Sequence, residues 1–314
     1  MIDVNEAIAR LDWSREPQGL YAPIAYALSS GGKRLRMQLV LAGCRLAGGN
    51  EQDALPFAEA IEVFHNFTLL HDDVMDRADV RRGKPTVHIK WNDNTAILSG
   101  DQMLISAYKL LESVPEQHLP QLLRLFTRTA TEICEGQQYD VDFEHRDDVQ
   151  IADYIKMIRL KTSVLLAAAL QGGAIIGEAT EEQQQALYDF GIHLGLAFQI
   201  QDDLLDCFGD PKTFGKAIGG DICCNKKTYL LLSALHNANP EQYEELKRGL
   251  TMPAGSEKIV AMKDLYIATH AKLAAEEAIQ QHTREALECL STLPQNDETQ
   301  RLQEMALSLA KRQV

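Results

Sequence analysis

The chain of 314 residues has few of the residues that build β-rich, disulfide-bonded or membrane-spanning proteins. Aromatic residues make up 6%, and there are 10 prolines and 20 glycines, whereas Ala, Leu, Glu, Gln and Lys are plentiful. Such a composition is typical of helices rather than of a β-sandwich or a barrel. The six cysteines show no C-x-x-C spacing, so we expect reduced thiols. No apolar run reaches the length of a transmembrane helix, which is about 20 residues.

Positive charge is also in short supply. The chain has 45 acidic residues and 31 Lys and Arg, so its formal net charge is −14. This negative charge argues against a nucleic-acid partner. The first six residues lack the basic segment and apolar core of a signal peptide, so we predict a soluble, cytoplasmic protein. We find no linker, and expect a single all-α domain over residues 1–314, large enough to bury a substantial core.

Apolar periodicity and Gly/Pro punctuation predict long helices. For the helix over 53–77 we expect Asp53 as the N-cap and Pro56 in the first turn. The other long segments expected to be helical are 94–112, 120–143, 151–176, 182–208, 222–237 and 256–290.

Two acidic clusters with the same spacing lie in otherwise apolar stretches of two of these helices. Successive helical residues advance by about 100°, so positions i and i+4 lie one turn apart on one face, with i+1 on the flank. Each cluster therefore presents one acidic face near the C-terminal end of its helix, where the helix dipole disfavours negative charge. The carboxylates are Asp72, Asp73, Asp76, Asp202, Asp203 and Asp206.

Carboxylates this close repel one another unless a cation lies between them. Ligands that are all oxygen suit Mg²⁺, which keeps waters and shares its sites with substrate phosphates. Two such faces predict a diphosphate held between metal ions. A solvated surface turn is the structural alternative for a single cluster, and the repetition argues against it.

Basic residues gather in two short segments. Residues 76–88 include Arg81 and Arg82, whose guanidinium groups match phosphate oxygens, and residues 31–36 (GGKRLR) form a glycine turn before a helix. His65 lies two turns before Asp72 on the same stripe, and the same spacing places Gln199 near the second acidic face.

Taken in order, residues 31–36, 62–76, 81–83 and 198–206 resemble the signature blocks of the trans-isoprenyl diphosphate synthases. This resemblance implies an all-helical bundle around a deep central cavity. It also implies a homodimer and three Mg²⁺ ions, replaceable by Mn²⁺, that bridge an allylic diphosphate to both acidic faces. The implied reaction joins isopentenyl diphosphate head-to-tail to the allylic substrate.

The resemblance also implies roles for individual residues. Those that match the isopentenyl diphosphate site are Lys33, Arg36, His65 and Arg82. Those that match groups on the allylic diphosphate are Arg81, Lys161, Lys216 and Lys226. Thr162 and Gln199 match residues beside the developing carbocation, whereas Gln137 and Asp140 resemble a motif next to the metal cluster and the substrate.

Product length depends in this family on the residues before the first acidic cluster. Phe67 and Thr68 occupy the fifth and fourth positions before Asp72, and the cluster has no two-residue insertion. This resembles a short-chain pattern with Phe67 as a floor residue, giving C15 to C20 products, farnesyl or geranylgeranyl diphosphate. Helical spacing alone instead makes Phe67 an ordinary core residue.

Three other functions stay open at this point. A synthase of longer chains would use the same motifs. A class I terpene cyclase also ionises a prenyl diphosphate, but usually carries a second motif of Asn-Ser-Glu type. A non-catalytic synthase subunit would have no need of two intact acidic clusters and a full set of basic residues.

Overall fold

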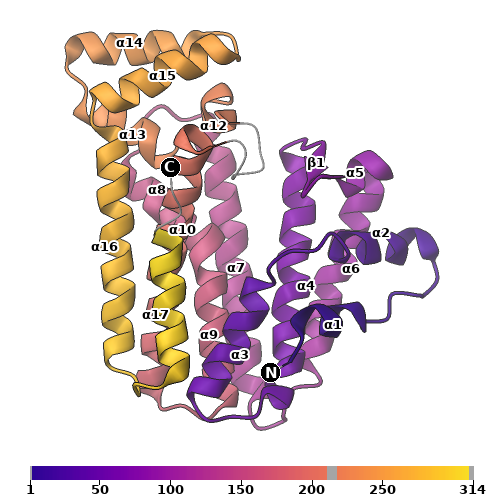
Figure 1. Ribbon diagram of the computed structural model, residues 1–314. Helices are drawn as coiled ribbons and strands as arrows, with labels where there is room; N and C mark the ends of the chain where they lie inside the picture. Colours follow the sequence, from indigo (N-terminus) through magenta and orange to yellow (C-terminus); the bar gives the residue numbers. More distant parts are fainter. Residues whose placement is uncertain (1, 211–217, 311–314) are drawn as a thin grey trace. The chain divides into compact units, whose positions relative to one another are not determined.

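The computed structural model describes residues 2–210 and 218–310 (Figure 1). The prediction of an all-α fold is confirmed. The exception is a short antiparallel hairpin in which β1 (Val80–Arg81) pairs with β2 (Lys84–Pro85). No helix within the described residues combines the length and the apolar character needed to cross a bilayer.

Contacts between Cα atoms divide the chain into two compact units. The first comprises residues 1–127 and 168–185, and the second comprises residues 128–167 and 186–314. The single domain expected over residues 1–314 remains a prediction.

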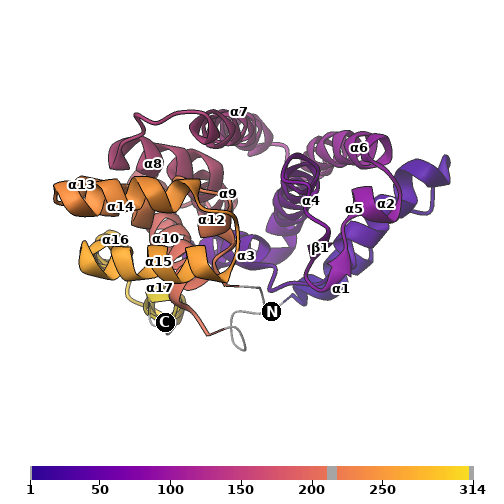
Figure 2. The ribbon, with the colours of Figure 1, turned by 90° about the horizontal axis from the view of Figure 1, so that it is seen from above.

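In the first unit, α4 (Glu51–Met75) is the central helix, with α3 (Leu35–Leu46) and α6 (Asp93–Leu111) packed against it (Figure 2). A Cβ on Gly43 would lie 2.2 Å from the carbonyl oxygen of Leu170, so glycine allows α3 to approach α9 (Val164–Ile176) closely. The remaining helices of this unit are α1 (Val4–Ala9), α2 (Gln18–Leu28) and α5 (Val87–Lys90).

The predicted start of the helix over 53–77 is wrong by two residues. Asn50 is the N-cap of α4 and its side chain accepts a hydrogen bond from the Gln52 amide. Glu51 then adds a negative charge to the first turn, where the helix dipole favours it. Pro56 consequently lies beyond the first turn.

The second unit takes in most of α7 (Leu119–Glu144) and of α10 (Glu181–Phe208), together with α8 (Ile151–Ile158) and the π-helical turn η1 (Arg159–Ser163). Within it α13 (Tyr229–Asn237) packs against α16 (Ala271–Ser291), which contacts α17 (Asp297–Ala310). The other helices are α12 (Gly220–Cys223), α14 (Pro240–Thr251) and α15 (Ser256–Ala268).

Two of the predicted helices are broken. The segment 222–237 consists of α12 and α13, because Asn225 adopts a left-handed conformation (φ 55°) and the Thr228 side chain caps α13. The segment 256–290 is interrupted between α15 and α16, where His270 has a φ of 58°. Both breaks depend on single left-handed residues other than glycine, which apolar periodicity does not reveal.

Candidate functional site

The first acidic cluster lies at the C-terminal end of α4, as predicted. Asp76 is the exposed C-cap, whereas Asp73 is buried. Arg81 Nε donates to Asp73 Oδ1 at 2.7 Å, and Arg81 Nη2 lies 3.6 Å from Asp72 Oδ2. Burial raises the pKa of Asp73, Arg81 opposes this shift and Asp72 adds to it. The neighbouring basic loop thus contacts the acidic cluster directly.

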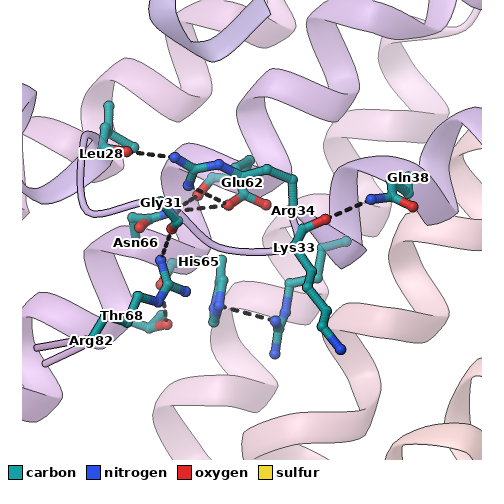
Figure 3. Close-up of polar contacts among 11 residues, drawn as sticks. Leu28, Gly31, Lys33, Arg34, Gln38, Glu62, His65, Asn66, Thr68 and Arg82 are labelled. Atoms are coloured by element: carbon teal, nitrogen blue, oxygen red, sulfur yellow. Dashed lines mark hydrogen bonds and ion pairs between the residues drawn. The ribbon is translucent and has the colours of Figure 1, made fainter. Parts of the chain in front are cut away.

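The glycine turn and the basic loop meet in the first unit. Gly31 and Gly32 have φ values of 75° and 128°, a conformation that glycine adopts without strain. A Cβ on Gly32 would lie 2.8 Å from Arg82 Nη1, and the Arg82 guanidinium donates to the Gly31 carbonyl (Figure 3). The structure therefore brings together the two basic segments that the sequence places about 50 residues apart.

Arg34, the residue of this turn to which no role was assigned, points inward and anchors it. Its Nη1 donates to Glu62 Oε1 at 2.9 Å, and both side chains are buried (Figure 3). The carbonyl of Leu28 accepts a further bond from Arg34, and the Asn66 amide donates to Glu62. A buried pair supported in this way leaves no uncompensated charge. The sequence signal for this pair was Glu62, because an acidic residue inside an apolar helix needs a buried partner.

Arg36 and His65 also belong to this cluster, and Arg36 Nη1 lies 3.0 Å from His65 Nε2. Burial and the charge of Arg82 lower the pKa of Arg36 to about 10, against the opposing effect of Glu62. Burial and the surrounding arginines lower the pKa of His65 well below its usual range. The buried Arg36 Nε has no hydrogen-bond partner. Crowded cations with an unsatisfied donor favour the binding of an anion.

Lys33, Phe67 and Thr68 complete the predicted residues of this unit. The Lys33 side chain is exposed, and its carbonyl accepts from Gln38 Nε2 at 2.6 Å. Phe67 is buried against Phe64 and His71, with ring centroids 5.5 Å and 4.8 Å away. The Thr68 hydroxyl donates to the carbonyl of His65 at 2.8 Å.

The second acidic cluster lies at the C-terminal end of α10. Asp203 is buried and accepts hydrogen bonds from Tyr154 Oη at 2.6 Å and from Gln199 Nε2 at 3.0 Å. The Thr162 hydroxyl in turn donates to Gln199 Oε1 at 3.0 Å. Thr162 and Gln199 are thus linked to the cluster as a chain of hydrogen bonds. Tyr154 was not predicted, since a buried tyrosine in an amphipathic segment has no distinguishing sequence signal.

Asp221 is a further carboxylate at this cluster that the sequence analysis missed. Its backbone amide donates to Asp206 Oδ2 at 3.0 Å. Burial and the neighbouring aspartates raise the pKa of Asp221 to about 7, and burial raises that of Asp203 to about 6, with Lys226 opposing both shifts. This excess of buried negative charge fits a cation. The pair Gly219-Gly220 directly before an acidic residue was the available signal.

Lys161 and Lys226 face one carboxylate. Lys161 Nζ donates to Asp140 Oδ2 at 2.6 Å, and Lys226 Nζ lies 4.0 Å from the same oxygen. Although burial opposes the change, Lys226 and Lys161 lower the pKa of Asp140. Gln137 lies one turn before Asp140 on α7 and is half-buried. The predicted residue Lys216 lies outside the described residues.

The turn that carries Lys161 and Thr162 is π-helical, a local irregularity that is frequent at functional sites. Gly136 lies against it: a Cβ at this position would be 2.4 Å from the Lys161 amide nitrogen. Glycine at 136 therefore sets how closely α7 approaches η1.

We expect Gly136→Ala to move Lys161 and to cost about 2 kcal/mol in the free energy of unfolding, because the new methyl group overpacks a backbone contact. A displaced Lys161 should also lower kcat by about tenfold. Chemical denaturation and steady-state kinetics measure the two effects. The control is Gly19→Ala in α2, where the added methyl group meets no atom within 4 Å. Equal behaviour of the two variants would contradict the proposed packing role.

Comparisons with known proteins identify the class to which this fold and these clusters belong. The family model of the polyprenyl synthetases matches residues 17–267, so the chain belongs to that family. It is 41% identical to a geranylgeranyl diphosphate synthase of Methanosarcina mazei over 74% of this chain and 72% of the relative. It is 36% identical to a short chain isoprenyl diphosphate synthase of Methanothermobacter thermautotrophicus over 90% and 86%.

Solved structures agree. A crystal structure of a geranylgeranyl pyrophosphate synthase matches with a TM-score of 0.92 and 47% identity, covering 99% of this chain and 96% of that one. A decaprenyl diphosphate synthase of Rhodobacter capsulatus matches with a TM-score of 0.88 and 30% identity, covering 98% and 93%. The geranylgeranyl pyrophosphate synthase of Corynebacterium glutamicum, complexed with isoprenyl diphosphate and magnesium, matches at 0.85 and 30%, covering 93% and 90%.

The predicted family and enzyme class are therefore confirmed. The chain is a trans-prenyltransferase that makes short-chain isoprenyl diphosphates. Members of its family use divalent metals and bind isoprenyl diphosphates.

Proposed function

We propose that this prenyltransferase elongates an allylic diphosphate with isopentenyl diphosphate to a C20 product, geranylgeranyl diphosphate. The names of its relatives support this length, and so does Phe67 before an uninterrupted first acidic cluster. The similarity to a decaprenyl synthase shows that the fold alone does not determine product length.

The observation that carries the proposal is the pairing of cation-rich and carboxylate-rich clusters. In the first unit Arg36 and Arg82 crowd positive charge around a buried unpaired donor, Arg36 Nε, beside His65, whose pKa this charge lowers. This arrangement suits the diphosphate of isopentenyl diphosphate, and Lys33 at the exposed end of the turn would add a further positive charge.

The two acidic clusters would hold Mg²⁺, with three ions expected when diphosphate is bound and Mn²⁺ as a substitute. Buried aspartates with raised pKa values fit this role, because a cation removes their mutual repulsion. Within the described residues neither cluster gathers three ligand atoms within 4.8 Å of one another. Diphosphate oxygens and waters would therefore complete each coordination shell, as Mg²⁺ prefers.

When bound, the metal supplies positive charge that favours departure of the allylic diphosphate. We propose that Arg81, Lys161, Lys216 and Lys226 neutralise the same leaving group. Gln137 and Asp140 would orient Lys161 and the nearby ligands. The hydrogen-bonded pair Thr162 and Gln199 would direct oxygen atoms toward the developing carbocation. The double bond of isopentenyl diphosphate then attacks the cation, and the released diphosphate accepts the proton.

The test of the proposed function is product analysis. Purified protein is incubated with Mg²⁺, isopentenyl diphosphate and dimethylallyl, geranyl or farnesyl diphosphate, and the products are sized by mass spectrometry. A main product of C20 supports the proposal. Products of C30 or longer would contradict the proposed length, and failure to extend any primer would contradict the proposed reaction.

Phe67 is expected to limit chain length. Replacement by alanine should shift the main product from C20 to C25 or longer, because it removes the ring that packs on Phe64 and His71. If Phe67→Ala stays active and its product distribution is unchanged, Phe67 does not limit chain length and is an ordinary core residue.

We further propose that the enzyme is a homodimer that uses an apolar face of α6. Ile97, Leu98 and Ile105 are 43%, 59% and 61% exposed. Leu98 and Ile105 lie two turns apart on one stripe of the helix, and Ile97 flanks this stripe. Sedimentation equilibrium should give twice the mass of the 35.0 kDa chain.

Leu98→Glu should shift the protein toward the monomer, because it places a charge in the face that the proposed dimer would bury. Leu273→Glu on α16, where leucine is 51% exposed, is the control.

A further inference from the structure

Two histidines and a glutamate converge in the second unit, on residues that the proposed reaction does not use. His193 lies on α10, whereas His282 and Glu285 lie three residues apart on α16. The two Nδ1 atoms are 3.3 Å apart. Glu285 Oε2 lies 3.0 Å from His193 Nδ1 and 2.9 Å from His282 Nδ1. Three potential ligand atoms, from two helices, therefore lie around a common central point.

These spacings are close to those of ligands around a small cation. Ligands about 2.0–2.1 Å from a tetrahedral zinc ion lie about 3.3–3.4 Å from one another. The two Nδ1 atoms already have this separation, whereas Glu285 Oε2, 3.0 Å and 2.9 Å from them, would move outward by about 0.4 Å on binding the ion. The two imidazole rings also stack, at 5.5 Å between centroids and 29° between planes.

Hydrogen bonds among the three side chains satisfy this arrangement less well than a bound cation would. One carboxylate oxygen would accept from both imidazoles while the two Nδ1–H groups point toward the same point at close range. A cation at this point would instead take a lone pair from each of the three atoms.

The donor set selects the kind of ion. Two imidazole nitrogens and one carboxylate oxygen suit Zn²⁺ and its neighbours in the first transition row, whereas Mg²⁺ prefers oxygen ligands. The side chains are 28%, 18% and 32% exposed for His193, His282 and Glu285. Solvent therefore has access for a water molecule as the fourth ligand.

We propose that His193, His282 and Glu285 form a binding site for a divalent transition-metal ion of the zinc class. The ion would link α16 to α10, the helix that ends in the second acidic cluster. Its role would be to fix α10 in place. This site is distinct in ligand chemistry from the proposed magnesium sites, and it does not depend on the proposed product.

The test is a calorimetric titration of the metal-free full-length protein with Zn²⁺ in excess Mg²⁺. We expect one Zn²⁺ site whose affinity falls at least about tenfold in His282→Gln and in His193→Gln, since each variant removes a ligand. Zn²⁺ should also raise the melting temperature of the original protein and not that of the variants.

His236→Gln is the matched control, because His236 is an exposed histidine outside the cluster. It should keep the affinity of the original protein. Retained prenyltransferase activity and circular dichroism show that the variants are folded. The proposal is overturned if the original protein binds no Zn²⁺ in excess Mg²⁺, or if both cluster variants bind it as tightly as the original protein does.

Discussion

Asp203→Asn should lower kcat by about a thousandfold, because it removes a charge that would hold a metal ion against the leaving diphosphate. A thousandfold corresponds to about 4 kcal/mol of transition-state stabilisation. The amide has nearly the same shape and can keep contacts to Tyr154 and Gln199. Metal-free stability should hold or rise, since burial disfavours the charged carboxylate. Single-turnover kinetics across a Mg²⁺ series would measure the loss of rate and the weaker metal dependence.

The control for this variant is Asp264→Asn, which removes the same charge from an exposed position on α15. It should leave kcat and the Mg²⁺ requirement unchanged. If Asp203→Asn kept kcat within about tenfold of the original enzyme, the second acidic cluster would not hold a catalytic metal ion.

Arg36→Gln should raise the KM for isopentenyl diphosphate by about 100-fold, with a smaller change for the allylic substrate. Hydrogen bonds to a charged group contribute about 1.5–3 kcal/mol each, and each 1.36 kcal/mol is a factor of ten. The free enzyme should not lose stability, because the change relieves repulsion with Arg82 and removes a buried, unpaired Nε. Initial rates with each substrate varied in turn, together with thermal unfolding, would separate binding from folding.

Arg124→Gln is a suitable control, because Arg124 is exposed on α7. A purely structural role for Arg36 would produce the opposite pattern, with lower stability and an unchanged KM. That outcome would contradict the proposed location of the isopentenyl diphosphate site at the glycine turn.

Much of the fold was predictable because most helices carry a strong apolar period. The helix expected over 182–208 is observed as α10 from Glu181 to Phe208, and that expected over 94–112 as α6 from Asp93 to Leu111. The failures share a cause. Asn225 and His270 interrupt the predicted helices through left-handed backbone conformations, and the pattern of apolar residues continues across them.

Site residues were predictable where charged side chains interrupt apolar helices or follow glycines. They were not predictable where the partner of a buried polar side chain lies far away in the sequence. Aspartates repeated in apolar helices, and arginines beside glycines, indicated the two clusters. Arg34 had the same local signal as Arg36, yet its partner Glu62 lies 28 residues away, and the sequence does not show which of the two arginines turns inward. Tyr154 was missed for a similar reason, since its hydrogen bond to Asp203 joins residues 49 positions apart.

The π-helical turn η1 contains one residue more than an α-helical turn needs, as though a single residue had been inserted there. Removing one residue from 159–163 would restore an uninterrupted α-helix from α8 to α9. Everything on α8 would then rotate by about 100° about the helix axis relative to α9. Tyr154 would turn away from Asp203 and lose its hydrogen bond to that carboxylate. The length of this segment is therefore under a stricter constraint than the identity of its residues, and a deletion there should be harder to tolerate than a substitution.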